Sequence, residues 1–337
     1  MSELEKIARA MVAPHKGILA ADESSPTIQK RFDSVHVEST QENRRAYREI
    51  LFTTPGAEEF VSGVILYDET IRQKAADGTP FPKLLERRGI LPGIKVDAGA
   101  KALAGAPGEK ITEGHDKLRE RLAEYKGLGA RFAKWRAVIE IGDGIPSDTC
   151  IDANAHTLAR YAALCVEGGI VPIVEPEVLM DGPHTIERCY EVTERTLRSV
   201  YAELYAQRVP LEQTILKPNM VVSGTKCPRQ AGLREVAEQT LRCLRASVPA
   251  AVPGIVFLSG GQSDEEATAH LNEMNRIGGG PWEISFSYGR ALQTAPLKAW
   301  AGRPENRAKA QQAFLHRARC NGAARSGGYT SEMEKAS

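Results

Sequence analysis

The chain has 337 residues, of which 42% are hydrophobic and 26% charged, and its formal net charge is +1. This composition is that of a folded protein with a large core and not of a disordered chain. The balanced charge gives no electrostatic reason to expect a nucleic acid or a membrane surface as a partner. The sequence has no apolar run as long as a membrane span and no signal peptide at its start, so we expect a cytoplasmic protein.

The cysteines give no sign of a disulfide framework or a metal centre. All six of them lie apart, without a CxxC pair and without a cysteine–histidine cluster at metal-ligand spacing. Several fall on apolar faces of predicted helices. We therefore expect reduced thiols buried in the core, and no metal site.

Eight short apolar runs are predicted to be strands, each followed by a helix or by a gap long enough for one. In chain order they cover residues 17–22, 61–67, 92–97, 130–141, 169–179, 214–221, 254–259 and 282–288. Helical periodicity predicts helices up to Met11 and over 40–52, 81–88, 115–125, 148–166, 184–207, 233–247, from Ser263 onward and over 305–323. Capping-box patterns mark three helix starts, at Ser2, Ser39 and Ser263. The last residues, from about 325 to 337, are expected to form a short mobile tail.

This alternation predicts a single (β/α)8 barrel, a TIM barrel, over residues 1–337. Most strands start about forty residues apart, close to the ~30–40 residues of one strand–helix unit in this fold. An open doubly wound sheet would carry a glycine-rich fingerprint after its first strand. The residues there, Asp22-Glu23-Ser24-Ser25, do not match one.

One lysine, Lys217, interrupts the apolar run 214–221. An ammonium group is costly to bury unless it is paired or neutral, and a neutral lysine amine is a nucleophile that forms a Schiff base with a carbonyl carbon. The alternative is that Lys217 ends its strand and extends its ammonium group to solvent. The segment alone leaves both interpretations open.

Polar side chains stand late in seven of the eight predicted strands, at the end where TIM barrels carry their active sites. Because side chains alternate with a period of two, the pairs 95/97, 134/136 and 175/177 each project to one side. Outward positions are covered by helices, so we expect these residues to converge on the barrel axis, although a buried ion-pair lattice would explain any single pair. They are Asp22, Lys95, Asp97, Lys134, Arg136, Glu175, Glu177, Lys217, Ser259 and Arg290.

The mixture of charges indicates a reaction on an anionic substrate. Neighbouring cations favour the neutral form of a lysine, and Lys134 is the natural neighbour of Lys217. Carboxylates at the same point can transfer protons. The segments 259–261 and 288–290 follow the seventh and eighth strands, which is the usual phosphate site of TIM barrels.

Eight segments of the chain together form a recognisable ordered set. They are GILAADES (17–24), ENRR (42–45), LPGIKVD (91–97), FAKWR (132–136), VEPE (174–177), LKPNMV (216–221), FLSGGQS (257–263) and FSYGRALQ (286–293). In this order they resemble the class I fructose-1,6-bisphosphate aldolases, which form a Schiff base. The resemblance extends from about residue 6 to about residue 330.

The resemblance implies reversible cleavage of fructose 1,6-bisphosphate to dihydroxyacetone phosphate and glyceraldehyde 3-phosphate, without a cofactor or a metal. Lys217 matches the Schiff-base lysine, and Glu175 matches the carboxylate that protonates and dehydrates the carbinolamine. Asp22 matches the acid that accepts the C4 hydroxyl proton. Lys134 matches a lysine that assists carbinolamine chemistry, and Glu177 matches a residue that helps to hold the lysine cluster.

The resemblance also implies two phosphate sites. Ser259, Gly260, Gly289 and Arg290 match the site for the C1 phosphate. Ser24, Thr27, Arg31, Lys95 and Arg136 match residues near the C6 phosphate. The partners are then phosphorylated sugars, with sedoheptulose bisphosphate and fructose 1-phosphate as further candidate substrates, and the resemblance suggests a homotetramer.

Two alternatives remain at the sequence level. Transaldolases and deoxyribose-phosphate aldolases use the same nucleophile, but they lack this ordered set of segments. A scaffold protein on the same barrel would be expected to have lost Lys217, Glu175 or Asp22, and all three are present.

The end of the sequence departs from part of the family. Eukaryotic members end in a tail whose terminal tyrosine transfers a proton at the enamine. Here the last tyrosine is Tyr329, which aligns better with a tyrosine upstream of that tail. We therefore expect slower proton exchange on dihydroxyacetone phosphate than in the tailed enzymes.

Overall fold

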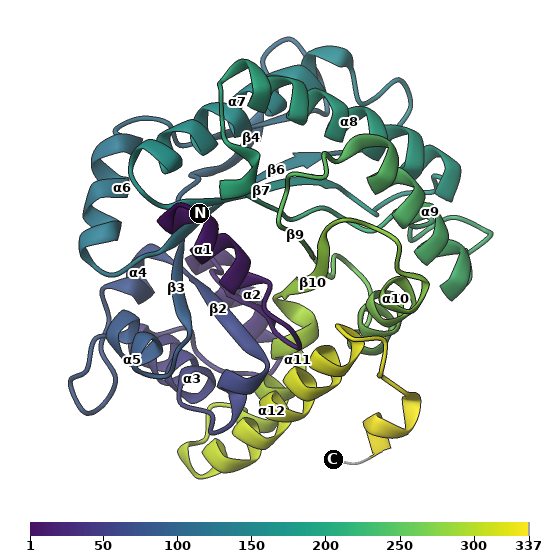
Figure 1. Cartoon of the computed structure of the whole chain (residues 1–337). Coiled ribbons are helices and arrows are strands. Elements are labelled where there is room, and N and C mark those ends of the chain that lie inside the picture. Colours follow the sequence, from purple (N-terminus) through teal and green to yellow (C-terminus); the bar gives the residue numbers. More distant parts are fainter. Residues whose placement is uncertain (336–337) are drawn as a thin grey trace.

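The computed structural model describes residues 1–335, and its centre is a closed barrel of eight parallel strands surrounded by helices (Figure 1). Around the barrel the strands follow the order β1-β10-β9-β8-β7-β6-β3-β2. They are β1 (Gly17–Ala21), β2 (Val61–Leu66), β3 (Leu91–Lys95), β6 (Phe132–Ile139), β7 (Val171–Val178), β8 (Ile215–Leu216), β9 (Gly254–Phe257) and β10 (Glu283–Tyr288). Each predicted strand thus has its counterpart, and the predicted TIM barrel is confirmed.

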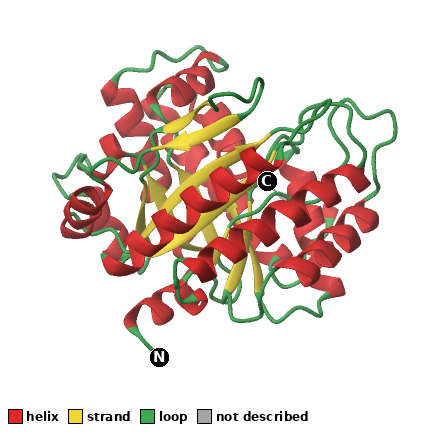
Figure 2. Cartoon of the chain, turned by 90° about the horizontal axis from the view of Figure 1, so that it is seen from above, coloured by secondary structure: helices red, strands yellow, loops and turns green. Residues whose placement is uncertain are grey.

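The helices form the outer layer, which Figure 2 shows around the strands. They are α1 (Glu3–Met11), α2 (Ser25–Asp33), α3 (Gln41–Phe52), α4 (Asp68–Ile71), α5 (Phe81–Arg87), α6 (Leu118–Gly127), α7 (Asp148–Glu167), α8 (Ile186–Ala206), α9 (Leu233–Ser247), α10 (Asp264–Ile277), α11 (Arg290–Trp300) and α12 (Arg307–Ala324). Short 3-10 helices cover Ala57–Glu59 (η1), Leu211–Gln213 (η2), Pro304–Asn306 (η3) and Ser331–Lys335 (η4). No helix within residues 1–335 is both long and apolar enough to span a membrane.

The part of the barrel interior near the amino ends of the strands is filled by apolar side chains. Ile18, Ile173 and Ile215 point inward there and pack with Phe132. A Cβ on Gly93 would lie 2.2 Å from the Phe132 ring, so glycine makes room for this large side chain. Helix α1 packs its buried side chains against the same cluster and closes this end of the barrel (Figure 1).

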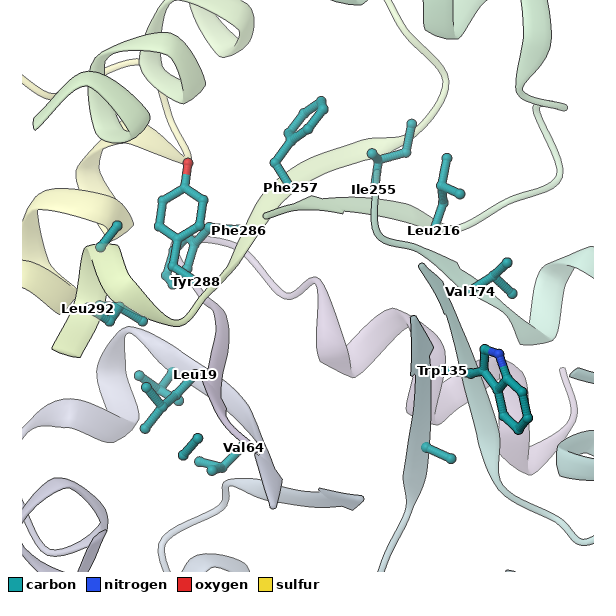
Figure 3. Close-up of a cluster of buried hydrophobic side chains, with 14 of the residues drawn as sticks. Leu19, Val64, Trp135, Val174, Leu216, Ile255, Phe257, Phe286, Tyr288 and Leu292 are labelled. Carbon is teal, nitrogen blue, oxygen red and sulfur yellow. The ribbon is translucent and has the colours of Figure 1, made fainter. Parts of the chain in front are cut away.

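A second apolar layer lies between the strands and the helices. Side chains such as Leu19, Val174 and Leu216 point away from the axis in Figure 3. Trp135 belongs to this layer, where its ring lies 5.5 Å from Tyr161 and 4.5 Å from His115. This confirms the interpretation of Trp135 as a packing residue. Apolar side chains fill the amino end of the barrel interior and the layer between strands and helices. Polar side chains can therefore occupy the inward positions near the carboxyl ends of the strands.

The predicted strand 214–221 is too long, because β8 ends at Leu216. Pro218 has no N–H to donate to a neighbouring strand, so the ladder cannot continue through it. The Lys217 N–H still donates to the Val174 carbonyl at 2.8 Å, which keeps this residue in register with β7. The apolar residues that follow are buried as a loop and not as a strand.

Three elements close to the cavity were not predicted, and one of them is α11, which begins at Arg290 in the cavity wall. Helix α2 starts directly after β1, with Ser24 as its N-cap. An antiparallel hairpin of β4 (Gly99–Ala102) and β5 (Lys110–Glu113) follows β3. Its sequence is rich in Gly and Ala and has little β propensity. Tertiary contacts hold the hairpin, such as the 2.8 Å hydrogen bond that Thr112 Oγ1 donates to the Arg136 carbonyl.

One helix start was also wrong by a residue. The N-cap of α3 is Thr40 and not Ser39, because the Thr40 hydroxyl accepts the Asn43 N–H. The box at Ser263 is complete, and Ser2 accepts the Glu5 N–H.

The tail predicted to be mobile extends two residues beyond the described part of the chain. Within the described part, Arg325 is buried and donates to the Val12 carbonyl at 3.1 Å. Glu334 forms an ion pair with Arg317 of α12 at 2.6 Å. These contacts would have to break for the segment to move, and its mobility stays a prediction.

Candidate active site

A cavity of about 320 Å³ opens at the carboxyl ends of the barrel strands. It brings together every site residue predicted from the sequence, from β1 around the barrel to α11. These are Asp22, Ser24, Thr27, Arg31, Lys95, Lys134, Arg136, Glu175, Glu177, Lys217, Ser259, Gly260, Gly289 and Arg290. The period-two alternation therefore gave the correct inward side for each of the paired positions.

Lys217 stands at the centre of a buried cluster of charges. Its side chain is 5% exposed, and its Nζ lies 3.1 Å from Glu175 Oε1. It does not extend to solvent, which excludes the alternative left open by the sequence. The other oxygen, Glu175 Oε2, lies 3.1 Å from Lys134 Nζ. Lys134 Nζ in turn lies 2.7 Å from Asp22 Oδ2, so one chain of contacts joins two amines and two carboxylates.

The opposite charges in this cluster outweigh the cost of burial. Burial by itself raises the pKa of Asp22 and of Glu175, but Lys134 and Lys217 lower both values below the ordinary range. Burial by itself lowers the pKa of Lys134, whereas Asp22, Glu175 and Asp97 raise it above the ordinary value of a lysine. Both carboxylates and Lys134 are thus charged at neutral pH and surround the Lys217 amine.

The loops after β9 and β10 form a polar wall beside Lys217. Ser259 is buried, and Gly260 has a φ of 58°, which favours glycine. Helix α11 begins at Arg290, with Gly289 as its N-cap. Free backbone N–H groups and the positive end of the helix dipole make such a terminus a site for an anion.

Arginines surround this wall. Burial and the positive charges of Arg31 and Arg136 lower the pKa of Arg290, while Glu177 raises it. A Cβ on Gly289 would lie 3.4 Å from Arg31 Nη2. Arg31 therefore lies next to the loop assigned to the C1 phosphate, although the resemblance placed it near the C6 phosphate.

The remaining predicted residues line other parts of the same cavity. Ser24 Oγ and Thr27 Oγ1 are 3.1 Å apart in the first turn of α2. Lys95 Nζ lies 2.9 Å from Asp97 Oδ1. Glu177 was expected to hold the lysine cluster, but its carboxylate pairs with the Arg136 guanidinium instead.

Sequence reasoning missed two polar residues that line the cavity, Glu23 and Ser287. Ser287 is 1% exposed, and its hydroxyl has no hydrogen-bond partner within the described residues. An unpaired buried hydroxyl in a cavity wall is suited to a polar ligand. The alternation Ile-Ser-Phe-Ser-Tyr in β10, with serines on the inward side, is the signal that could have revealed it.

Fold and site together define a TIM-barrel protein with a lysine-centred site for an anionic substrate. Comparisons with known proteins agree. The sequence profile of the class I fructose-bisphosphate aldolases matches residues 3–337. A probable fructose-bisphosphate aldolase class 1 of Xanthomonas campestris pv. campestris is 63% identical over 325 residues, 96% of this chain and 97% of that protein.

Two further proteins support the same conclusion. The cytosolic fructose-bisphosphate aldolase 4 of Arabidopsis thaliana is 54% identical over 322 residues, 95% of this chain and 82% of that protein. The aldolase of Plasmodium falciparum, solved in complex with TRAP and a small molecule inhibitor, matches with a TM-score of 0.96 and 49% identity, over 98% of this chain and 95% of that chain.

The chain therefore belongs to the class I fructose-bisphosphate aldolase family. It is an enzyme that reversibly cleaves fructose 1,6-bisphosphate to dihydroxyacetone phosphate and glyceraldehyde 3-phosphate through a lysine Schiff base.

Proposed function

We propose that Lys217 is the lysine that forms the Schiff base with the substrate ketone. Its amine attacks the C2 carbonyl carbon and gives a carbinolamine. Glu175 lies 3.1 Å from Lys217 Nζ, so this carboxylate accepts the proton that the nitrogen gives up and returns it to the carbinolamine hydroxyl, which leaves as water. The product is an iminium group, which serves as an electron sink.

Asp22 is the general base of the cleavage step in this proposal. It accepts the proton of the C4 hydroxyl, the C3–C4 bond breaks, and its electron pair passes to the iminium nitrogen to form an enamine. The aldehyde leaves as glyceraldehyde 3-phosphate. Lys134 lies within 3.1 Å of both carboxylates, and its positive charge stabilises the anions between proton transfers.

The phosphate groups bind at the two sides of the cavity. Ser259, Gly260, Gly289 and Arg290 hold the C1 phosphate at the start of α11. Ser24, Thr27, Lys95 and Arg136 hold the C6 phosphate, and Arg31 stands between the two sites. Glu177 orients Arg136 through their ion pair, and the free hydroxyl of Ser287 binds the substrate between them.

The enamine must be protonated at C3 before the second product leaves. Tyr329 is not available for this in the present conformation, because its hydroxyl donates to Glu334 Oε1 at 2.9 Å. Our candidate proton donors are a water molecule and Glu175, the carboxyl group nearest to the Lys217 nitrogen, once Glu175 has taken a proton from solvent. We accordingly expect the enzyme to exchange the C3 proton of dihydroxyacetone phosphate slowly with solvent. NMR in deuterated water measures this rate.

The chain of contacts Lys217–Glu175–Lys134–Asp22 carries this proposal. It is tested by borohydride reduction with and without dihydroxyacetone phosphate, followed by peptide mapping. We expect one ligand-dependent adduct, on the peptide that contains Lys217, and none in Lys217→Arg. An adduct on Lys134 or Lys95 would show that the roles are assigned wrongly, and the absence of any adduct would contradict the covalent role of this site.

The family and its relatives also support proposals on the setting of the enzyme. We propose that it acts in the cytoplasm, as the cytosolic relatives do, and that it forms a homotetramer. Sedoheptulose bisphosphate and fructose 1-phosphate are proposed as further substrates, since both present the same ketone and C1 phosphate. Light scattering of the purified protein tests the tetramer, and kinetic assays with each sugar test the substrates.

A further inference from the structure

The carboxyl end of the chain docks onto α12, away from the residues that line the catalytic cavity. Glu334 of η4 accepts hydrogen bonds from Arg317 Nη1 at 2.6 Å on both of its oxygens. The Tyr329 hydroxyl donates to Glu334 Oε1 at 2.9 Å. The carboxylate is therefore held in one orientation, with Oε2 turned toward a histidine of α12.

That histidine, His316, is one helical turn away from Cys320, so both side chains lie on the same face of α12. His316 Nε2 is 3.7 Å from Cys320 Sγ and 3.4 Å from Glu334 Oε2. Cys320 is buried, whereas the side chains of His316 and Glu334 are 18% and 15% exposed. These three side chains are thus already close together, with Cys320 in the interior and the other two reached by solvent.

These two distances match those between ligands of a tetrahedral zinc ion, and the third pair, Cys320 Sγ and a Glu334 oxygen, lies within 4.8 Å. With Zn–N and Zn–O bonds of about 2.1 Å and a Zn–S bond of about 2.3 Å, adjacent N and O ligands are about 3.4 Å apart, and N and S ligands about 3.6 Å. A charged N–H···O hydrogen bond between His316 and Glu334 would be shorter, about 2.7–2.9 Å. Among residues 1–335, this is the one group of three or more His, Cys, Asp or Glu ligands close enough to hold a metal ion.

The surroundings resemble those of a metal centre in a second respect. Ligating carboxylates are commonly held by hydrogen bonds from the protein. Here Arg317 and Tyr329 donate to Glu334 Oε1, and Arg317 also donates to Oε2, whose second lone pair is available to an ion. Arg317 is itself fixed by Thr268 and by the Asp264 carbonyl of α10, at 2.6 and 3.0 Å.

We propose that His316, Cys320 and Glu334 bind one zinc ion, with water as the fourth ligand. Nitrogen, sulfur and carboxylate oxygen are the donors that zinc prefers over magnesium or calcium. The ion fastens the C-terminal segment to α12 and takes no part in the cleavage reaction. The sequence-based statement that no cysteine stands near a histidine at metal spacing is wrong for Cys320, and the third ligand lies in a different segment.

The test uses the full-length enzyme after treatment with a chelator. Titration with Zn²⁺ by calorimetry should give one ion per chain, and Co²⁺ should give the thiolate-to-cobalt absorption in the near ultraviolet. Cys320→Ser, His316→Gln and Glu334→Gln should each weaken binding by at least ~100-fold, since even residues that only orient metal ligands contribute ~10–100-fold. Zn²⁺ should also raise the melting temperature of the wild type and not that of Cys320→Ser.

Cys227→Ser is the matched control, because Cys227 is a buried free thiol outside this group. It should bind Zn²⁺ as the wild type does. Cleavage activity verifies that each variant is folded, since none of these residues lines the cavity. The proposal is overturned by an absence of saturable binding to the wild type. It is equally overturned if the cobalt absorption persists in Cys320→Ser, or if His316→Gln binds as tightly as the wild type.

Discussion

Two clusters of buried charges lie back to back at the end of β1, and they differ in what they face. The first is Asp22, Lys134, Glu175 and Lys217, whose contacts are 2.7–3.1 Å and which line the cavity. The second joins Glu23 to Arg31, Arg48, Glu69 and Arg44, of which Arg48, Glu69 and Arg44 are absent from the cavity wall. Asp22 and Glu23 are neighbours in sequence and belong to different clusters.

Helix α3 supplies both Arg44 and Arg48 to the second cluster. Arg48 is 1% exposed and lies 3.7 Å from both Glu23 Oε2 and Glu69 Oε1. It donates to the Glu23 carbonyl at 3.1 Å. Gln293 of α11 holds the same turn, because its side-chain amide donates to the Ala20 carbonyl at 2.7 Å and to Glu23 Oε1 at 2.6 Å. Arg48, Glu69 and Arg44 do not line the cavity, so this part of the cluster fixes the backbone that carries Asp22.

The comparison teaches that buried ion pairs of the same chemistry serve different purposes according to what they face. Charges on the cavity can change partners when a substrate enters. Charges behind the strand, such as Arg48, have no such space, and losing one removes a partner from a buried charge. Substitutions in the first cluster should therefore reduce the rate, and those in the second should reduce stability.

The largest effect is expected for Lys217→Arg. Arginine keeps the positive charge beside Glu175, so the fold should persist, but it cannot form a Schiff base. We expect kcat to fall by at least ~10⁴-fold, since loss of a covalent nucleophile can cost on the order of 10⁶-fold. Steady-state kinetics checks this, and retention of a tenth of the activity would contradict the covalent role.

The two carboxylates of the first cluster should be separable by the step that they slow. Glu175→Gln and Asp22→Asn should each lower kcat by ~10²–10⁴-fold, the usual range for a positioned acid or base. Borohydride trapping with dihydroxyacetone phosphate distinguishes them. Asp22→Asn should still form the adduct at nearly the normal rate, whereas Glu175→Gln should form it slowly. Equal trapping rates in both variants would show that our division of roles is wrong.

Arg48→Met tests the second cluster. It should lower the free energy of unfolding by ~1–3 kcal/mol, because Glu23 and Glu69 lose a buried partner although Arg31 and Arg44 still pair with them. The kcat per folded molecule should stay within about tenfold of the wild type. Urea denaturation and kinetics on the same preparation measure both quantities. A large loss of kcat with unchanged stability would show that the second cluster serves catalysis and not stability.

Acid should weaken the first cluster. The folded-state pKa values of Asp22 and Glu175 are lowered by Lys134 and Lys217, against the effect of burial. A carboxylate with a lowered pKa contributes stability above its unfolded pKa, about 3.9 for Asp and 4.3 for Glu, and loses it as the pH falls through the folded value. Asp22→Asn should therefore lose less stability than the wild type between neutral pH and about pH 3. Urea denaturation at both pH values measures the loss of unfolding free energy. An equal loss in Asp22→Asn and in the wild type would contradict this prediction.

The smallest effect is expected at the surface. Arg72 pairs with Asp68 and Glu124, but its side chain is 42% exposed. Solvent-exposed pairs contribute ~0–1 kcal/mol, so Arg72→Met should change the free energy of unfolding by less than ~1 kcal/mol. It serves as the control for Arg48→Met. A loss as large as that of the buried variant would show that burial is not what separates the two pairs.

The sequence by itself determined the barrel and most of the charged residues in its cavity. Apolar runs at regular spacing predict alternating strands and helices, and the period of two predicts which side of each strand faces the axis. For this reason Lys134, Glu175 and Lys217 could be assigned to one site before the structure was known.

Only the tertiary structure decided how these charges are paired. No local pattern links Glu177 to Arg136, places Arg31 beside Gly289 or leaves the Ser287 hydroxyl without a partner. The β4–β5 hairpin and the contact of Glu334 with α12 depend on segments distant in the sequence. Such contacts follow from where the packed elements place their side chains, which local propensity and periodicity do not encode.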